Sequence, residues 1–193
     1  MPKAVSRRSL NVAGILLFVA TVQFVVMLFI TEAMYAGYSI SNNYISDLGV
    51  GSTGVLFNTS ISALGIAVVV DSFFVYRGFG SPVFASLIAL TGLGALLVGV
   101  FNENYGTIHS YVSYFTFIVG PLTAIYAYRF ESGAMAYASI ILGLISYFAI
   151  VIFLLYHNPP VIGRGGWERL VVYPFLLWGV GFGGYLAGLS DKR

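Results

Sequence analysis

The sequence has no cysteine, two histidines and few charged residues. The absence of cysteine excludes disulfide bonds, thiolate metal ligands and a cysteine nucleophile, but it says nothing about the redox compartment. Charged residues make up 8% of the chain, against about 25% in a typical globular protein. The formal net charge of +2 is too small to indicate a nucleic-acid partner.

Hydrophobic residues, in contrast, make up 59% of the 193 residues and occur in long runs. A soluble fold of this size cannot bury so much apolar surface, so lipid must surround most of it. A bilayer core about 30 Å thick requires about 20 apolar residues in a helix. The sequence therefore predicts an all-α polytopic membrane protein, a single domain over 1–193 with six transmembrane helices in a compact bundle. The predicted spans are about 10–35, 55–75, 82–101, 108–128, 134–156 and 168–189.

The basic residues lie mostly at one end of the predicted bundle. One side carries Lys3, Arg7, Arg8, Arg77, Arg129, Lys192 and Arg193, and the other carries Arg164 and Arg169. Because positive residues favour the cytoplasmic side, we expect a cell-membrane protein with both termini in the cytoplasm. The first span is longer than the apolar region of about 7–15 residues in a usual signal peptide, so we interpret it as an uncleaved anchor. Asp71, near the cytoplasmic end of the second span, is expected to pair with Arg77 or to reach the membrane surface.

Most of the remaining polar chemistry lies in the three predicted external connections. Asp47 lies in the connection 36–54, Glu103 and His109 lie between the third and fourth spans, and Glu168 opens the sixth. These four are the candidate catalytic residues, because carboxylates and imidazole transfer protons. A helix N-terminus favours the neutral form of His109, which accepts a proton or binds a metal.

Two groups of ligand-binding residues follow from the same loops. Asn43, Ser46 and Arg169 are candidate substrate-binding residues, with Arg169 suited to an anionic group such as phosphate. Asp47, Glu103 and His109 are candidate ligands of a divalent metal, because oxygen and nitrogen ligands without cysteine suit Zn, Mn or Mg.

Three sequence clusters also resemble a known family. They are Asn-Tyr-Ile-Ser-Asp-Leu at 43–48, Phe-Asn-Glu at 101–103 with His109, and Gly-Gly-Trp-Glu-Arg at 165–169. Their order and spacing are similar to those of the six-span prokaryotic membrane family catalogued as domain of unknown function 998. The resemblance covers nearly the whole chain and implies a polytopic membrane protein with no established activity. The positions that it marks as family-like are Ser46, Asp47, Glu103, His109, Glu168 and Arg169.

These residues are compatible with three functions. The first is a membrane-embedded hydrolase or transferase, using acid–base or metal-assisted chemistry on a lipid headgroup or another anionic ligand. The second is a non-enzymatic scaffold, binding or transport component whose external charges form a structural clasp. In that clasp the acids Asp47, Glu103 and Glu168 pair with Arg164, Arg169 and His109. The least favoured is a haem protein with His109 and His157 as axial ligands.

The distribution of Lys and Arg makes the topology testable. A reporter that is active only in the cytoplasm should be active when fused after Arg193 and silent when inserted in the connection 36–54, because the basic residues favour cytoplasmic termini. The opposite pattern of activity would contradict the predicted orientation.

Overall fold

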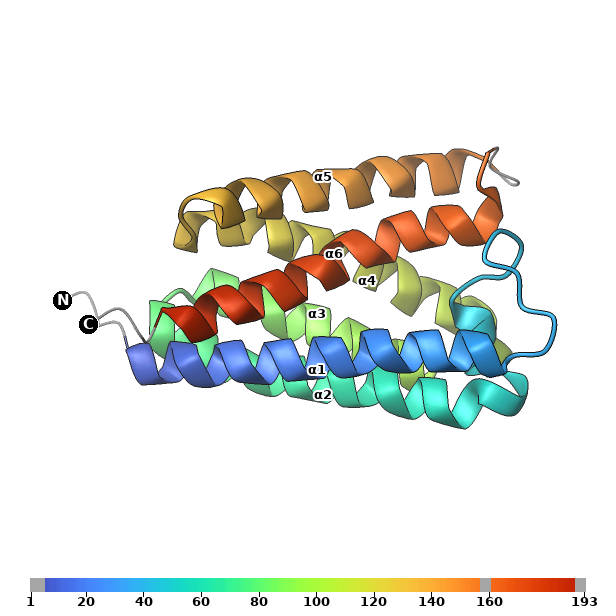
Figure 1. Cartoon of the computed structure of the whole chain (residues 1–193), viewed down its shortest axis with the longest axis horizontal. Helices are drawn as coiled ribbons and strands as arrows, with labels where there is room; N and C mark the ends of the chain where they lie inside the picture. The colour runs from blue at the N-terminus through green and yellow to red at the C-terminus, as the bar shows by residue number, and fades with distance from the viewer. Residues whose placement is uncertain (1–5, 157–160, 190–193) are drawn as a thin grey trace.

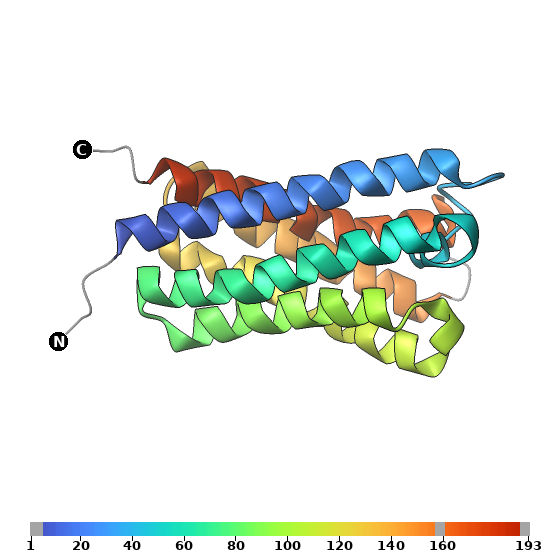
Figure 2. The same ribbon diagram turned by 90° about the horizontal axis from the view of Figure 1, so that it is seen from below.

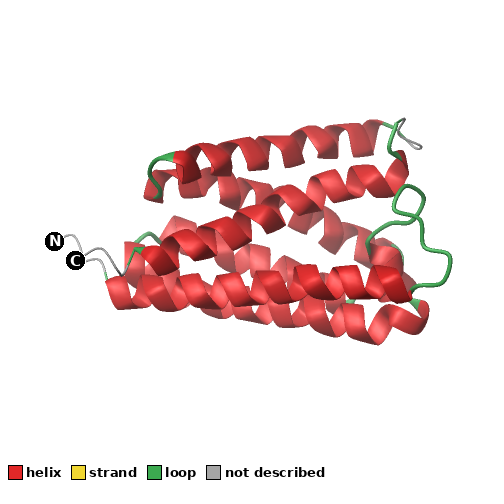
Figure 3. Cartoon of the chain, in the orientation of Figure 1, coloured by secondary structure: helices red, strands yellow, loops and turns green. Residues whose placement is uncertain are grey.

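The computed structural model describes residues 6–156 and 161–189, and in these residues six long helices lie side by side along one axis (Figure 1). Their bounds are α1 Arg7–Met34, α2 Gly54–Phe79, α3 Pro82–Val100, α4 Thr107–Ala127, α5 Ala134–Leu155 and α6 Gly163–Gly188. Helices and loops account for all of this described part, which contains no strand (Figure 3). All six helices are long and apolar enough to cross a membrane. The prediction of an all-α, six-helix, multi-pass membrane protein is therefore confirmed.

The connections alternate between the two ends of the bundle (Figures 1 and 2). We call the loop end the one formed by residues 35–53, residues 101–106 and the start of α6. The terminal end is the opposite one, where α1 begins and α6 ends. Its α2–α3 turn is tight, because Gly80 adopts a left-handed conformation with φ of 69° and Ser81 caps α3. The loop end carries the longer connections and the short 3-10 helices Ser46–Gly49, Gly51–Thr53 and Glu103–Tyr105.

Glycine lets two pairs of helices approach closely. A Cβ added to Gly65 in α2 would lie 2.7 Å from the Gly92 carbonyl oxygen of α3, and closer still to a backbone nitrogen of that helix. A Cβ on Gly14 in α1 would lie 2.6 Å from the Gly183 carbonyl oxygen of α6. Such close backbone packing drives helix association in lipid, where no hydrophobic force acts between helices. These crossings hold α2 against α3 and α1 against α6.

Helix α5 packs on α4 and α6, on the side of the bundle away from α1 and α2 (Figure 1). It is the helix least covered by protein, since 22% of its most apolar segment is buried, against 39–50% in the other five. The helix therefore has lipid on its outer face and forms an outer wall beside α4 and α6.

Asp71 does not make the expected contact with Arg77. Its side chain is fully buried in the bundle, and neither carboxylate oxygen has a hydrogen-bond partner. Arg77 instead lies over the ring of Phe73, with 5.6 Å between the guanidinium carbon and the ring centroid. Six positions along an α-helix turn the side chain by about 240°, so the two residues lie on different sides of α2. The predicted pairing and the predicted surface position are both wrong.

The close α2–α3 crossing makes a stability prediction. Gly65→Ala should lower the stability by about 1–3 kcal/mol, because the added methyl group has no room between the helices. Gly184→Ala is the matched control, since nothing lies within 4 Å of the added Cβ. That variant should be unchanged or gain up to about 1 kcal/mol from helix propensity. Thermal unfolding in detergent measures both, and equal midpoints would show that the crossing is not tight.

Candidate functional site

A cavity of about 340 Å³ lies at the loop end, between α4, the end of α5, the start of α6 and the 35–53 loop. We call it the loop-end cavity. Its polar lining includes Tyr44, Ser46, Glu103, His109, Ser113, Tyr114, Arg164 and Glu168, and its apolar lining is Phe117, Phe153 and Leu154. The volume falls in the range of about 300–1,000 Å³ found for small-molecule sites. Four of the predicted site residues therefore meet in one cavity: Ser46, Glu103, His109 and Glu168.

His109 is held at the cavity by its place in α4 and by a hydrogen bond to Phe101. It is in the first turn of α4, as predicted, and its Nδ1 is 2.7 Å from the Phe101 carbonyl oxygen. Because a carbonyl only accepts hydrogen bonds, Nδ1 carries the proton and Nε2 holds the lone pair. The hydroxyl of Ser113, one turn along α4, lies 3.3 Å from Nε2 and donates to it. The imidazole is thus oriented with its basic nitrogen next to Ser113.

Glu103 begins the 3-10 helix that leads into α4, and it meets the 35–53 loop. The Ser46 hydroxyl donates to its carboxylate at 2.7 Å. Burial raises the pKa of Glu103, the Ser46 hydrogen bond lowers it in part, and the nearby Asp47 carboxylate raises it again. A raised carboxyl pKa makes the protonated form easier to reach, which suits a group that donates a proton.

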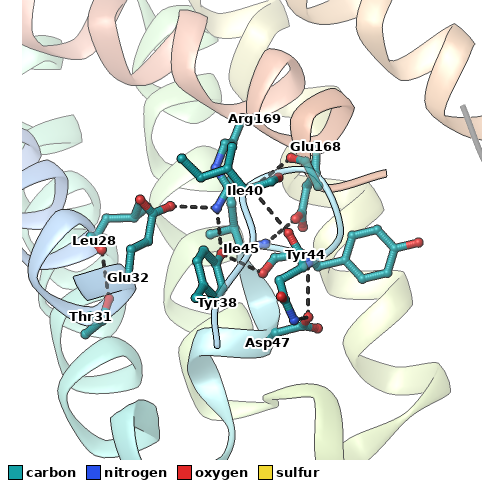
Figure 4. A network of polar contacts seen from close by, with 12 residues as sticks. Leu28, Thr31, Glu32, Tyr38, Ile40, Tyr44, Ile45, Asp47, Glu168 and Arg169 are labelled. Carbon is teal, nitrogen blue, oxygen red and sulfur yellow. Dashed lines mark hydrogen bonds and ion pairs between the residues drawn. The ribbon is translucent and has the colours of Figure 1, made fainter. Parts of the chain in front are cut away.

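Glu168 and Arg169 are neighbours in α6 with separate environments (Figure 4). The Glu168 carboxylate is buried, lines the cavity and accepts a hydrogen bond from the backbone N–H of Ile45. Consecutive residues of a helix point about 100° apart. Arg169 therefore points away from the cavity, toward α1 and the inner side of the 35–53 loop.

Arg169 forms the centre of a structural clasp (Figure 4). One terminal nitrogen donates to the carbonyl oxygens of Ile40, Asn43 and Gly165 at 3.1, 3.2 and 2.9 Å. The other donates to Glu32 at 2.6 Å and to the Tyr38 hydroxyl at 2.5 Å. We call this set of contacts the Arg169 clasp. It ties α1, the loop and α6 together, and its acid is Glu32 in α1, which is not one of the acids expected from the sequence.

Asp47 and Asn43 shape the 35–53 loop and do not line the cavity. The Asp47 carboxylate accepts from the Asn43 side-chain amide at 2.7 Å and from the Tyr44 backbone N–H at 3.1 Å. The Asn43 side-chain oxygen in turn accepts from the Ser39 backbone N–H at 3.0 Å. These bonds fold the loop back on itself next to Tyr44 and Ser46, which line the cavity.

Arg164 is the cationic residue that lines the cavity. Its guanidinium carbon lies 4.8 Å from the centroid of the Tyr44 ring, and its Nε donates to the Asn42 carbonyl oxygen at 2.6 Å. It comes from the glycine-rich run 163–166, which forms the first turn of α6, so the helix begins before the predicted start at Glu168. Gly165 lies against the carbonyl oxygens of Ile40 and Asn43, where any side chain would collide.

The geometry gives no support to the predicted metal site. Within residues 6–156 and 161–189, no group of three or more His, Asp or Glu side chains is arranged to hold a metal ion. Of the predicted ligands, Glu103 and His109 line the cavity and Asp47 does not. The haem hypothesis needs His157, which lies outside the described residues.

Comparison with known proteins places this fold and site in a family. A family model described as "Protein of unknown function (DUF998)" matches residues 18–184. The chain belongs to this family. No curated protein and no solved structure matches the chain. The matched part of this DUF998 protein runs from α1 to α6 and contains both the loop-end cavity and the Arg169 clasp.

Sequence reasoning missed three residues of this region in the DUF998 protein: Glu32, Ser113 and Arg164 as a cavity residue. A signal for Ser113 was present, because a spacing of four residues places it on the same helix face as His109. No such signal exists for Glu32, since its partner Arg169 is separated from it by 137 positions.

The Arg169 clasp makes a stability prediction. Arg169→Gln should cost about 3–5 kcal/mol, because it leaves the mostly buried Glu32 and three carbonyl oxygens without their donor. Arg164→Gln is the control, and it should change stability by about 0–1 kcal/mol because Arg164 is exposed. Thermal unfolding and protease cleavage of the 35–53 loop measure the difference, and equal behaviour of the two variants would contradict the clasp.

A second variant separates charge from geometry. Arg169→Lys keeps the positive charge but has no planar fork to reach Glu32, Tyr38 and the three carbonyl oxygens together. It should therefore lie closer to Arg169→Gln than to the wild type in both measurements.

Proposed function

We propose that this DUF998 protein binds the polar head of an amphiphilic molecule in the loop-end cavity and acts on it by acid–base chemistry, as a membrane-embedded hydrolase or transferase. The observation that carries the proposal is the meeting of His109, Glu103 and Glu168 in one cavity, while Arg169 is engaged elsewhere. A purely structural set of charges would have paired these acids with the available arginines.

The class of ligand follows from the position and lining of the cavity. It lies where α4 and α6 begin and α5 ends, which is the level of the lipid headgroups if the helices span a bilayer. Its polar residues lie beside Phe117, Phe153 and Leu154, so it offers both polar and apolar contacts. Arg164 is exposed and favours an anionic or strongly polar head, since guanidinium groups bind phosphate and carboxylate well.

His109 is the proposed base. Its Nδ1–H is anchored on the Phe101 carbonyl, which leaves the Nε2 lone pair to accept a proton. Glu103 is the proposed acid, because burial and the nearby Asp47 raise its pKa. Glu168 is buried in the wall with its carboxylate anchored on the Ile45 N–H, and we assign it to positioning the ligand.

One observation, the Arg169 clasp, supports the scaffold hypothesis. The clasp uses Arg169, Glu32, Tyr38 and loop carbonyls, whereas the cavity uses His109, Glu103 and Glu168. Glu103 and Glu168 also bond the loop, at Ser46 and Ile45, but they do so while lining the cavity and without an arginine partner in the described part of the chain. This separation favours chemistry over scaffolding alone.

The proposal is tested with the full chain in nanodiscs that contain a total polar lipid extract. The wild type should convert one lipid class over time, and mass spectrometry of the lipids identifies it. His109→Gln keeps a donor for the Phe101 carbonyl but removes the base, so the rate should fall by about 10²–10⁴-fold. The matched control is Tyr111→Phe, in the same helix and 70% exposed, which should keep the wild-type rate.

Two results would overturn the proposal. One is a wild type that converts no lipid and retains none in the cavity after purification. The other is a His109→Gln variant that is folded, as judged by its unfolding midpoint, and converts lipid as fast as the wild type.

A further inference from the structure

A second, smaller chamber lies behind the loop-end cavity, inside the bundle. It has a volume of about 60 Å³ and an almost wholly apolar lining, which includes Phe24, Phe57, Leu64, Ala95, Val98 and Leu176. We call it the inner chamber. Since one water requires about 10–15 Å³ of such volume, the chamber holds roughly four to six water-sized groups. Its apolar walls favour a few carbon atoms of a ligand over water.

The two spaces meet at a shared wall. Ser46, Ser113, Phe117 and Glu168 line both the loop-end cavity and the inner chamber. A molecule that occupied both spaces would have its polar part among Glu103, His109 and Arg164, and its apolar part among residues of α1, α2, α3, α4 and α6. The junction between the polar and the apolar part of this molecule would lie next to Ser113.

Ser113 has an unusual partner for a serine inside a helix. Its hydroxyl lies 3.3 Å from the Nε2 of His109. In the same helix, Thr116 and Ser110 donate to backbone carbonyls one turn back, at 2.8 and 3.4 Å. The Ser113 hydroxyl thus contacts the His109 imidazole, and the imidazole is in turn fixed by the Phe101 carbonyl. A nucleophile, its base and a group that orients the base have this arrangement in enzymes that use a covalent serine intermediate.

We propose that Ser113 is the nucleophile of an acyl transfer, and that the substrate is an amphiphilic ester whose acyl group enters the inner chamber. The inference rests on the proposed function and names its reaction and substrate class. In such an ester the carbonyl carbon stands between the polar head and the apolar chain. Ser113 stands at the matching boundary between the two spaces.

The steps balance with water as the second reactant. The Ser113 oxygen attacks the ester carbonyl carbon, and its proton passes to Nε2 of His109. The bond from the carbonyl carbon to the alcohol oxygen then breaks, and the imidazolium returns the proton to that oxygen. The alcohol leaves through the loop-end cavity, and the acyl group stays on Ser113. Water attacks the acyl-serine, its proton passes through His109 to the serine oxygen, and a carboxylic acid is released.

A fluorophosphonate probe with a short alkyl chain tests the nucleophile without knowledge of the natural ester. It should label the purified full chain in detergent on Ser113, as located by peptide mass spectrometry. Ser113→Ala should lose the label by at least about 100-fold, and His109→Gln should slow it by about 10²–10⁴-fold. The control is Ser72→Ala in α2, because the Ser72 hydroxyl donates to the Val69 carbonyl. This variant should be labelled like the wild type.

The outcomes separate this inference from the proposed function. An unlabelled wild type, or a folded Ser113→Ala variant that is still labelled, overturns the role of Ser113. If lipid conversion then continues and still depends on His109, the proposed function stands and acyl transfer through Ser113 fails. If no lipid is converted or retained, both fail.

The inner chamber has a test of its own. Ala95 is 8% exposed and lines it, so Ala95→Leu should fill much of its volume. With p-nitrophenyl acetate and p-nitrophenyl hexanoate as probes, the ratio of hexanoate to acetate hydrolysis should fall at least about 10-fold in this variant. An unchanged ratio would overturn the placement of the acyl group in the chamber.

Discussion

The loop end depends on the requirement that the charge of a buried guanidinium be balanced by an acid and by hydrogen-bond acceptors. Arg169 meets it through its terminal nitrogens, which contact Glu32, Tyr38, two loop carbonyls and one carbonyl of α6, and its side chain is 7% exposed. Removing one partner of such a buried pair is costly, because the other charge stays buried. The guanidinium therefore holds the 35–53 loop against α1 and α6. That anchor supports the segment whose Ser46 hydroxyl and Ile45 N–H donate to Glu103 and Glu168.

This arrangement assigns the structural and the chemical roles to different residues. Arg169 and Glu168 are adjacent, yet the helix turn sends the first to the clasp and the second to the cavity. Asp47 likewise bonds Asn43 and Tyr44 in its own loop, while Ser46 reaches Glu103. The loop end is thus a rigid frame around a cavity whose acids and imidazole have no arginine as an ion-pair partner among the described residues.

The architecture was readable from the sequence because each interval between charges is long enough to span a bilayer. The sequence also placed Asp47, Glu103, His109 and Glu168 at one end of the bundle, and three of these four, without Asp47, line the cavity. A clasp at Arg169 was one of the alternatives, but its acid was not foreseen, because Glu32 is far away in sequence. The start of α6 was also misplaced. The glycine-rich run 163–166 predicts a loop, because glycine has a low helix propensity. In the structure, Gly165 packs closely on the carbonyl oxygens of the 35–53 loop, and this packing favours a helix there.

Ser113 shows what the fold adds to a spacing that the sequence already contained. It lies four positions after His109, which places both on one face of α4 but does not choose between a packing contact and a reactive pair. Two further observations come from the tertiary structure. The Phe101 carbonyl fixes the ring so that its lone pair faces the hydroxyl, and Ser113 also lines the inner chamber. A hydroxyl bonded only for packing would not need to stand at the boundary between a polar and an apolar space, whereas the nucleophile for an amphiphilic ester must.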